Sequence, residues 1–209
     1  MQQGSPAWKT WRREGIGGSD IATILGLSPF EDATRENLIR EKVDGWEKER
    51  NWAMTRGTRM EPTARGAYCR ERKCTARPVC VEHDSVSWAR VSLDGLCSAI
   101  AGAARANLTW ILELKCPNWQ THSMALAGYV PDYYECQCQW QLWVAGLHHC
   151  EFASFTEHSR FDQDNRVGIV ELTADNGRQM EILQAASEFW YDVADRKAAK
   201  RVGRVTAGI

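Results

Sequence analysis

The sequence of 209 residues lacks any long apolar segment. A helix that spans a bilayer needs roughly 20 consecutive apolar residues, so this absence argues against a membrane protein. The first residues also lack the basic and apolar pattern of a signal peptide, and we expect a cytoplasmic protein. With 44% hydrophobic and 25% charged residues, the composition is typical of a globular domain that buries a core.

Metal-binding cysteine pairs are missing as well. The eight cysteines include no Cys-x-x-Cys pair, which disfavours a zinc ribbon. In the densest cluster, Cys136 and Cys138 are two apart on a predicted helix and do not share a face. We interpret the cysteines as reduced thiols that act as small hydrophobic side chains. A brown chromophore in the purified protein would instead indicate an iron–sulfur cluster.

The net charge is only −1, but the charged residues are unevenly distributed along the sequence. Residues 1–77 hold 15 Lys or Arg against 11 Asp or Glu, and residues 78–209 hold 11 against 16. The segment 48–77 alone has nine basic and three acidic residues. Such a block can neutralise phosphates. A solvated helix face would give the same pattern.

Hydrophobic periodicity predicts a helical first third, followed by strands that are flanked by further helices. Mixed strands between helices form an α/β or α+β sandwich. Gly57 and Pro62 are expected to split or bend one long helix, and the chain from Lys200 is expected to be loose. The predicted helices are 6–14, 19–26, 31–43, 50–73, 119–127, 132–145 and 174–198, and the predicted strands are 77–83, 87–92, 109–115, 150–155 and 167–171.

Three residues on two short apolar segments suggest metal chemistry. Asp94 follows Val-Ser-Leu, and Glu113 and Lys115 lie two apart in Ile-Leu-Glu-Leu-Lys. In a strand, Glu113 and Lys115 therefore point to the same face. Mg²⁺ binds one or two carboxylates together with water and substrate phosphate oxygens, which Asp94 and Glu113 could provide. A turn at Asp-Gly and an exposed Glu-x-Lys pair are the simpler alternative.

Other segments extend this candidate site. Glu61, in the basic segment, could add a third carboxylate, or could be a surface residue. On the helix predicted for 132–145, Tyr134, Gln137 and Gln141 form an uncharged polar face, which suits hydrogen bonding to phosphate or to a lysine. Near the start, Ser19 is a good N-cap of a helix that follows several glycines, a natural place for a phosphate.

Taken together, these segments resemble the lambda exonuclease (YqaJ) family of phage recombination nucleases, which belongs to the PD-(D/E)xK superfamily. The resemblance runs from about residue 8 to residue 155 and implies a single nuclease domain, 1–209, with an α/β restriction-endonuclease-like core. Its parts would be a helical region of about 1–75, a catalytic region of about 76–155 and a C-terminal strand and helix of about 165–199. The family proline before the aspartate is Leu93 here. The matching motifs are Trp8-x₃-Arg12-x₆-Ser19-Asp20, Gly57-x₃-Glu61, Ser92-Leu93-Asp94-Gly95, Glu113-Leu114-Lys115-Cys116-Pro117 and Tyr134-x₂-Gln137-x-Gln139.

The resemblance implies a role for each matching residue. Asp94, Glu113 and the Leu114 backbone carbonyl would bind Mg²⁺, with Mn²⁺ as a possible substitute, and Glu61 would serve a second ion. Lys115 would orient and help to deprotonate the attacking water. Tyr134 and Gln137 would hold the lysine. The terminal 5′-phosphate would be bound by Arg12, Ser19, Ser92 and Gln137. The DNA end would be contacted by Trp8 and Met54.

The implied activity is a 5′→3′ exonuclease that degrades one strand of linear duplex DNA to mononucleotides and leaves 3′ overhangs. The implied partners are DNA ends, a single-strand annealing protein and two further copies of the chain in a homotrimeric ring. The implied location is the cytoplasm of a bacterial host cell, and the protein would be encoded by the host or by a prophage. A structure- or site-specific DNA endonuclease of the same fold is one alternative, and a non-catalytic DNA-end-binding protein is another.

Overall fold

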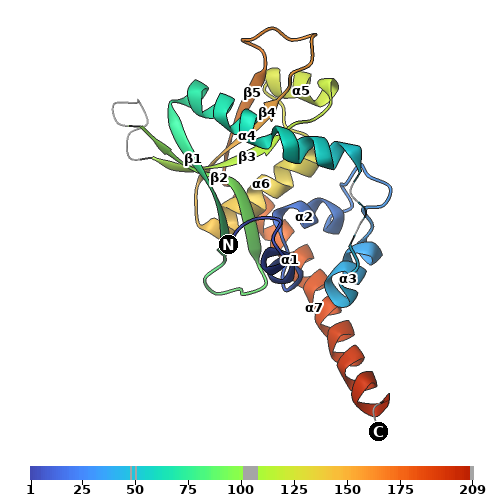
Figure 1. The fold of residues 1–209 in the computed structure, drawn as a ribbon. Helices are drawn as coiled ribbons and strands as arrows, with labels where there is room; N and C mark the ends of the chain where they lie inside the picture. The colour runs from blue at the N-terminus through green and yellow to red at the C-terminus, as the bar shows by residue number, and fades with distance from the viewer. Residues whose placement is uncertain (48, 50, 101–107, 208–209) are drawn as a thin grey trace.

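A computed structural model describes residues 1–47, 49, 51–100 and 108–207, with the side chains of 203–207 outside the description. Its centre is a mixed sheet in which the strands lie in the order β1-β2-β3-β4-β5 (Figure 1). Helices lie on both faces, so the predicted α/β class with a mixed central sheet is confirmed. The strands are β1 (Cys74–Glu82), β2 (Arg90–Ala99), β3 (Thr109–Lys115), β4 (His149–Phe155) and β5 (Val167–Thr173).

One strand pair in the sheet is parallel. Strands β3 and β4 run in the same direction, whereas β1–β2, β2–β3 and β4–β5 are antiparallel. Parallel neighbours require a crossover connection, because a tight hairpin can join only antiparallel strands. Helices α5 (Trp119–Leu126) and α6 (Asp132–Ala145) form that crossover.

Helix α6 lies in the core on one face of the sheet. It packs against β1 to β4 and against α2 (Gly18–Ile24) and α7 (Asn176–Ala207). Trp140 of α6 is buried in the same cluster as Ile111 and Phe152 of the sheet and Phe189 of α7. Because α6 is covered on nearly all sides, its glutamines are also buried. A buried polar group needs a hydrogen-bond partner, and the site below supplies several of these partners.

Helix α4 (Trp52–Arg72) covers the other face and contacts β1, β3 and β5. Tyr68 of α4 donates a hydrogen bond to the buried Glu151 of β4 at 2.5 Å, and Trp110 donates to the Tyr68 hydroxyl at 2.7 Å. Arg72 also donates to Glu151, at 3.0 Å. These contacts fix α4 against the sheet, since a buried carboxylate is costly unless it is paired.

Several boundaries differ from the predictions. Helix α4 is not split at Gly57 or Pro62, because Met60 and Tyr68 on both sides of Pro62 are buried against the sheet. The strand predicted for 87–92 instead covers Arg90–Ala99, because it pairs with both neighbours and continues through Gly95.

The C-terminal region is helical where a loose tail was expected, because α7 continues to Ala207. Lys200 pairs with Asp44 at 2.6 Å and Lys197 with Glu14 at 2.9 Å, so α7 is tied to the region of α1 (Pro6–Arg13) and α3 (Arg35–Asp44). Helix α3 begins at Arg35 rather than near residue 31, since Thr34 is its N-cap.

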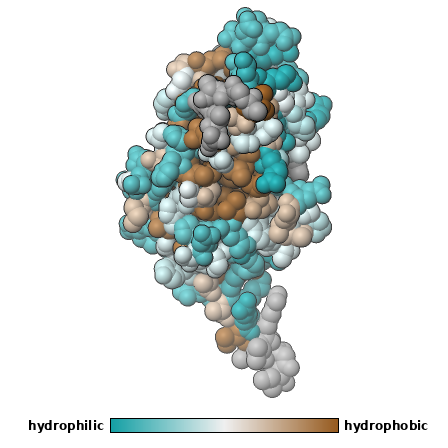
Figure 2. Space-filling view, turned by 90° about the vertical axis from the view of Figure 1, so that its left-hand side faces the viewer, coloured by the Kyte–Doolittle hydropathy of each residue, from teal (hydrophilic) through white to brown (hydrophobic). Residues whose placement is uncertain are grey.

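No helix in the described part of the chain is long and apolar enough to cross a membrane. Seen from the side of β1, the surface is mostly hydrophilic with a hydrophobic area near its centre (Figure 2). Strand β1 is at the edge of the sheet.

Candidate active site

The two candidate carboxylates lie where β2 and β3 separate. The antiparallel register of these strands runs from Ser98–Thr109 to Gly95–Leu112. Asp94 comes just before Gly95 and Glu113 just after Leu112, so both residues follow the last pair of the ladder. The backbone N–H of Leu114, released from the ladder, donates to Oδ2 of Asp94 at 2.8 Å. The end of the ladder therefore brings together residues that are 19 positions apart in the sequence.

Glu113 is held by three donors. Its side chain is 1% exposed and faces α6. Gln137 donates to Oε1 at 2.7 Å and Gln141 donates to Oε2 at 2.5 Å. Lys115 lies 2.5 Å from Oε1. These partners orient both carboxylate oxygens, because charge-assisted hydrogen bonds are short and directional.

Lys115 shares its strand face with Glu113, as predicted from their spacing. Its ammonium group also lies 5.1 Å from the centre of the Tyr134 ring, so Tyr134 contacts the lysine through its aromatic face. Burial acts to lower the pKa of Lys115, but the carboxylates of Glu113 and Asp94 outweigh burial and raise it. The ammonium form is therefore favoured while both carboxylates are charged.

Asp94 responds to the crowded charges in the opposite way. Burial and the nearby Glu113 carboxylate raise the pKa of Asp94 to about 8. A second negative charge is therefore unfavourable here unless a cation offsets it. Two hard oxygen ligands that face one cavity fit a divalent ion such as Mg²⁺, which needs one or two carboxylates from the protein.

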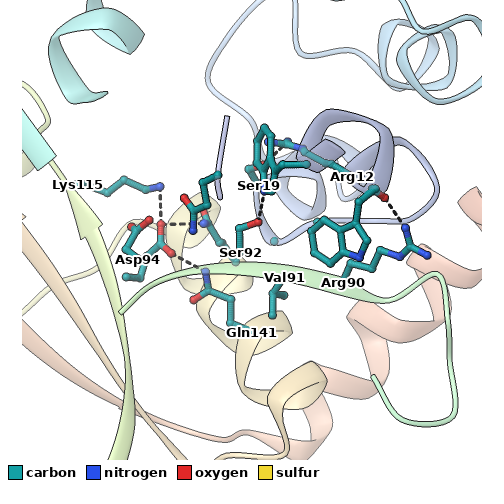
Figure 3. A pocket seen from close by; sticks show the side chains of 15 residues that line it. Arg12, Ser19, Arg90, Val91, Ser92, Asp94, Lys115 and Gln141 are labelled. Atoms are coloured by element: carbon teal, nitrogen blue, oxygen red, sulfur yellow. Dashed lines mark hydrogen bonds and ion pairs between the residues drawn. The ribbon is translucent and has the colours of Figure 1, made fainter. Parts of the chain in front are cut away.

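A cavity of about 200 Å³ connects this pair to the N-terminal helices (Figure 3). Asp94, Glu113 and Lys115 line one end, and Arg12 and Ser19 line the other. The positions are far apart in the sequence, and the approach of α2 to α6 brings them together.

Arg12 and Ser19 are in direct contact at the second end. Arg12 Nη2 donates to Ser19 Oγ at 2.6 Å and to Asp20 Oδ1 at 2.9 Å. The sequence predicted Ser19 as the N-cap of α2, and this prediction is wrong. Gly17 is the N-cap, and its backbone N–H donates to Asp20 Oδ2 at 2.8 Å. Ser19 lies inside the helix, and its hydroxyl faces Arg12.

Ser92 belongs to the same cavity. Trp8 Nε1 donates to Ser92 Oγ at 2.7 Å, and the Arg12 guanidinium lies 5.4 Å from the Trp8 ring centre. Trp8 therefore contacts two of the predicted phosphate ligands at once.

Two buried residues without a predicted role support Arg12. Asp20 and Lys42 are 3% and 1% exposed, and Lys42 Nζ donates to Asp20 Oδ2 at 2.7 Å. Asp20 is part of the motif that begins at Trp8, but its position in the sequence does not predict which charged residue it pairs with. Lys42 gave a signal that was missed: it follows Leu38 and Ile39 by four and three residues, on the apolar side of α3.

Glu61 does not complete a cluster of three carboxylates. Within the described residues, no group of three or more His, Cys, Asp or Glu side chains is arranged to hold a metal ion. The carboxylate of Glu61 is paired with Arg65, and Arg65 Nε donates to the Asp94 carbonyl oxygen at 3.0 Å. Glu61 is therefore connected to Asp94 through an arginine.

The remaining predicted residues lie elsewhere or contribute other atoms. Met54 is 43% exposed in the first turn of α4 and is not among the residues that line the cavity. Leu114 contacts Asp94 through its N–H, and the metal-binding role of its carbonyl stays a prediction. All eight cysteines are free thiols.

Comparison with solved structures identifies proteins of the same fold. An alkaline exonuclease from Laribacter hongkongensis, LHK-Exo, is 25% identical with a TM-score of 0.78, over 97% of this chain and 100% of that one. LHK-Exo in complex with dAMP gives a TM-score of 0.79 at the same identity and coverage. A phage-related exonuclease from Haemophilus somnus 129PT shares the fold at 13% identity, with a TM-score of 0.59, over 87% of this chain and 95% of that one.

Curated relatives match only locally. Protein D345L of two African swine fever virus isolates, Tick/Malawi and Badajoz, is 42% and 40% identical over 48 residues. The match spans 21% of this chain and only 14% of the viral proteins. The YqaJ-like viral recombinase domain, in contrast, matches residues 7–148 and so includes every candidate site residue. The chain belongs to the YqaJ-like viral recombinase family and has the PD-(D/E)xK fold of phage-type exonucleases.

Proposed function

We propose that this protein is a Mg²⁺-dependent 5′→3′ exonuclease that degrades one strand of linear duplex DNA to 5′-mononucleotides. The observation that carries the proposal is that Asp94, Glu113 and Lys115 line one end of a cavity whose other end is lined by Arg12 and Ser19. The complex of LHK-Exo with dAMP supports a mononucleotide product.

The chemistry is assigned to the first end. Mg²⁺, or Mn²⁺ in its place, would be held by Asp94, Glu113 and the Leu114 carbonyl, and a bound ion stabilises charge on the phosphoryl oxygens. Glu61 would contribute to a second ion through water or after release from Arg65. Gln137 and Gln141 fix the Glu113 carboxylate by hydrogen bonds, and groups that hydrogen-bond to a metal ligand commonly orient it in this way.

Lys115 would orient the attacking water and stabilise the negative charge that develops on its oxygen. Glu113 fixes the position of the ammonium group from one side, and the Tyr134 ring contacts it from another. This arrangement limits the freedom of a long side chain, which favours a reactive geometry.

The direction of degradation is assigned to the second end. Arg12, Ser19 and Ser92 would bind the 5′-phosphate of the terminal nucleotide, and Gln137 would contact it from α6. A terminal phosphate held at one end of the cavity would place the next phosphodiester near the carboxylates. The enzyme would then release one nucleotide at a time from a 5′ end.

The assembly is also a proposal. A homotrimeric ring would surround the DNA, and an annealing protein would take up the 3′ overhang. The hydrophobic area on the β1 side is of the kind found at contacts between protein chains (Figure 2). Trp8 and Met54 would contact the DNA end. Light scattering tests the ring directly, since a mass near three chains is expected and a stable monomer would contradict it.

The competing function is an endonuclease that uses the same residues. A covalently closed plasmid and the same plasmid linearised with one cut separate the two activities. We expect the linear form to be degraded with Mg²⁺ and the closed form to stay intact, whereas linearisation of the closed form would favour the endonuclease. If neither form is cut under any divalent metal, the remaining hypothesis is a non-catalytic DNA-end-binding protein.

A further inference from the structure

Arg12 is held from behind by two buried charged residues. Its guanidinium donates to Asp20 Oδ1, and the other oxygen of Asp20 accepts from Lys42 Nζ at 2.7 Å. Lys42 Nζ also donates to the Arg12 carbonyl oxygen at 3.3 Å. The three residues therefore form a closed network that connects α1, α2 and α3.

The depth of this network limits what each residue can contact. The Lys42 and Asp20 side chains are 0% and 3% exposed, whereas Arg12 is 30% exposed and lines the cavity. Lys42 does not line this cavity. Lys42 can therefore act on a substrate in this cavity only through its neighbours.

The charges suggest what Lys42 does. Arg12 and Asp20 alone form a neutral pair, which attracts an anion weakly. With Lys42 the three residues carry a net charge of +1, and the positive end that is nearest to solvent is Arg12. Glu41 lies 3.7 Å from Lys42, but burial and the nearby Asp20 carboxylate raise the pKa of Glu41 and so disfavour its negatively charged form. Arg12 Nε is moreover buried with no hydrogen-bond partner in the described part of the chain, which leaves a donor to be satisfied.

We propose that Asp20 and Lys42 are positioning residues that give the cavity its selectivity for a terminal 5′-phosphate. Asp20 orients the Arg12 guanidinium, and Lys42 offsets the charge of Asp20 so that Arg12 keeps a net attraction for the phosphate. A terminal phosphate carries a charge of about −1.5 to −2, and an internal phosphodiester carries −1, so the net charge at Arg12 favours the terminal group. This inference rests on the proposed function.

The test compares linear duplexes that differ only in a 5′-phosphate or a 5′-hydroxyl, with kcat and KM measured for each. For the wild type we expect the phosphorylated end to be preferred. Lys42→Met should reduce that preference in kcat/KM by about tenfold or more, mainly through KM. Without Lys42, the charge of Asp20 weakens the hydrogen bond from Arg12 to the phosphate, and a hydrogen bond to a charged group contributes roughly that much. Lys9→Met is the control, because Lys9 pairs with Glu47 at the surface of the same region and lies outside the network.

A double variant separates charge from folding. In Lys42→Met with Asp20→Asn, position 20 no longer holds a buried carboxylate that lacks its lysine, and Arg12, which reaches the cavity, again carries an uncompensated positive charge. We expect this double variant to recover most of the preference that Lys42→Met loses. If Lys42→Met does not fold, the double variant carries the test, and a loss of its preference for the 5′-phosphate would overturn the inference.

The outcomes also separate the two proposals. A wild type that degrades both ends equally would contradict the proposed 5′-phosphate grip itself. A wild type that prefers the phosphate, with a Lys42→Met variant that keeps the full preference, would contradict only the role of Lys42 and Asp20.

Discussion

Gln141 of α6 donates its side-chain amide to Oε2 of Glu113 at 2.5 Å, and both side chains are 1% exposed. This contact joins the helical crossover to the strand that carries the catalytic candidates. The approach is close enough that Gly18 of α2 lies against the same helix, where an added Cβ would be 3.4 Å from Gln141 Cγ. Three elements therefore determine how one carboxylate is oriented.

Replacing Gln141 by Leu should impair catalysis by about ten- to a hundredfold, because a buried oxygen of a proposed metal ligand loses its donor. The Mg²⁺ concentration for half-maximal activity should rise as well. Gln139→Leu is the matched control on the same helix, since Gln139 is also buried but contacts Thr173 and Asp175. If both variants shift the Mg²⁺ dependence equally, Gln141 has no specific role at the metal site.

Lys115→Ala should abolish cleavage while the protein still binds DNA, because the ammonium group is assigned to the attacking water and not to DNA affinity. The rate of nucleotide release and the Kd for a duplex end measure the two properties separately. Lys9→Ala, at an exposed site, should leave both unchanged. Retained cleavage in Lys115→Ala would remove the lysine from the mechanism.

Two Gly→Ala substitutions should change different properties, with one lowering activity and the other raising stability. At Gly18 the new Cβ would lie 3.1 Å from Gln137 Cγ, so Gly18→Ala should displace the glutamines and lower activity. At Gly57, inside α4, nothing lies within 4 Å, and Gly57→Ala should stabilise the fold by roughly 0.5–1 kcal/mol. Activity assays and denaturant unfolding distinguish them. A destabilised Gly57→Ala would contradict the continuous helix.

Acid should weaken the fold through Asp20. Burial acts to raise the pKa of Asp20, but Lys42 and Arg12 lower it to about 2, below the value near 3.9 of an unfolded chain. The resulting stability is present above about pH 4 and is lost as the pH falls toward 2, at a cost of about 2–3 kcal/mol. Denaturant unfolding between pH 5 and pH 2 measures it. Asp20→Asn should show a shallower decrease, and an identical decrease would contradict this assignment.

Much of the fold followed from hydrophobic periodicity. The segment that became β3 was predicted with its bounds, and α6 was predicted from the same kind of pattern. The breaks expected at Gly57 and Pro62 did not occur, because buried residues along α4 outweigh the local cost of glycine and proline. Local propensity is a weak prior in such a case.

The site was predictable where its residues share one element and less so where folding joins distant ones. Glu113 and Lys115 followed from the period of a strand. The sequence predicts that Gln141 lies on a polar face of its helix. Its contact with Glu113 could not be predicted, because that contact depends on how α6 packs on the sheet. Lys42 was the hardest, because a lysine between apolar positions of α3 reveals a buried ion pair only when Asp20 is placed beside it.

The central claim is that this chain removes nucleotides from a 5′ end, and digestion of a 5′-phosphorylated linear duplex tests it most directly. One strand carries a label at its 5′ end, and in a second sample the same strand carries the label at its 3′ end. With Mg²⁺, we predict that the 5′ label appears at once as a mononucleotide, while the 3′ label stays on a strand that shortens gradually. Early release of the 3′ label, or fragments cut from the interior, would contradict the account.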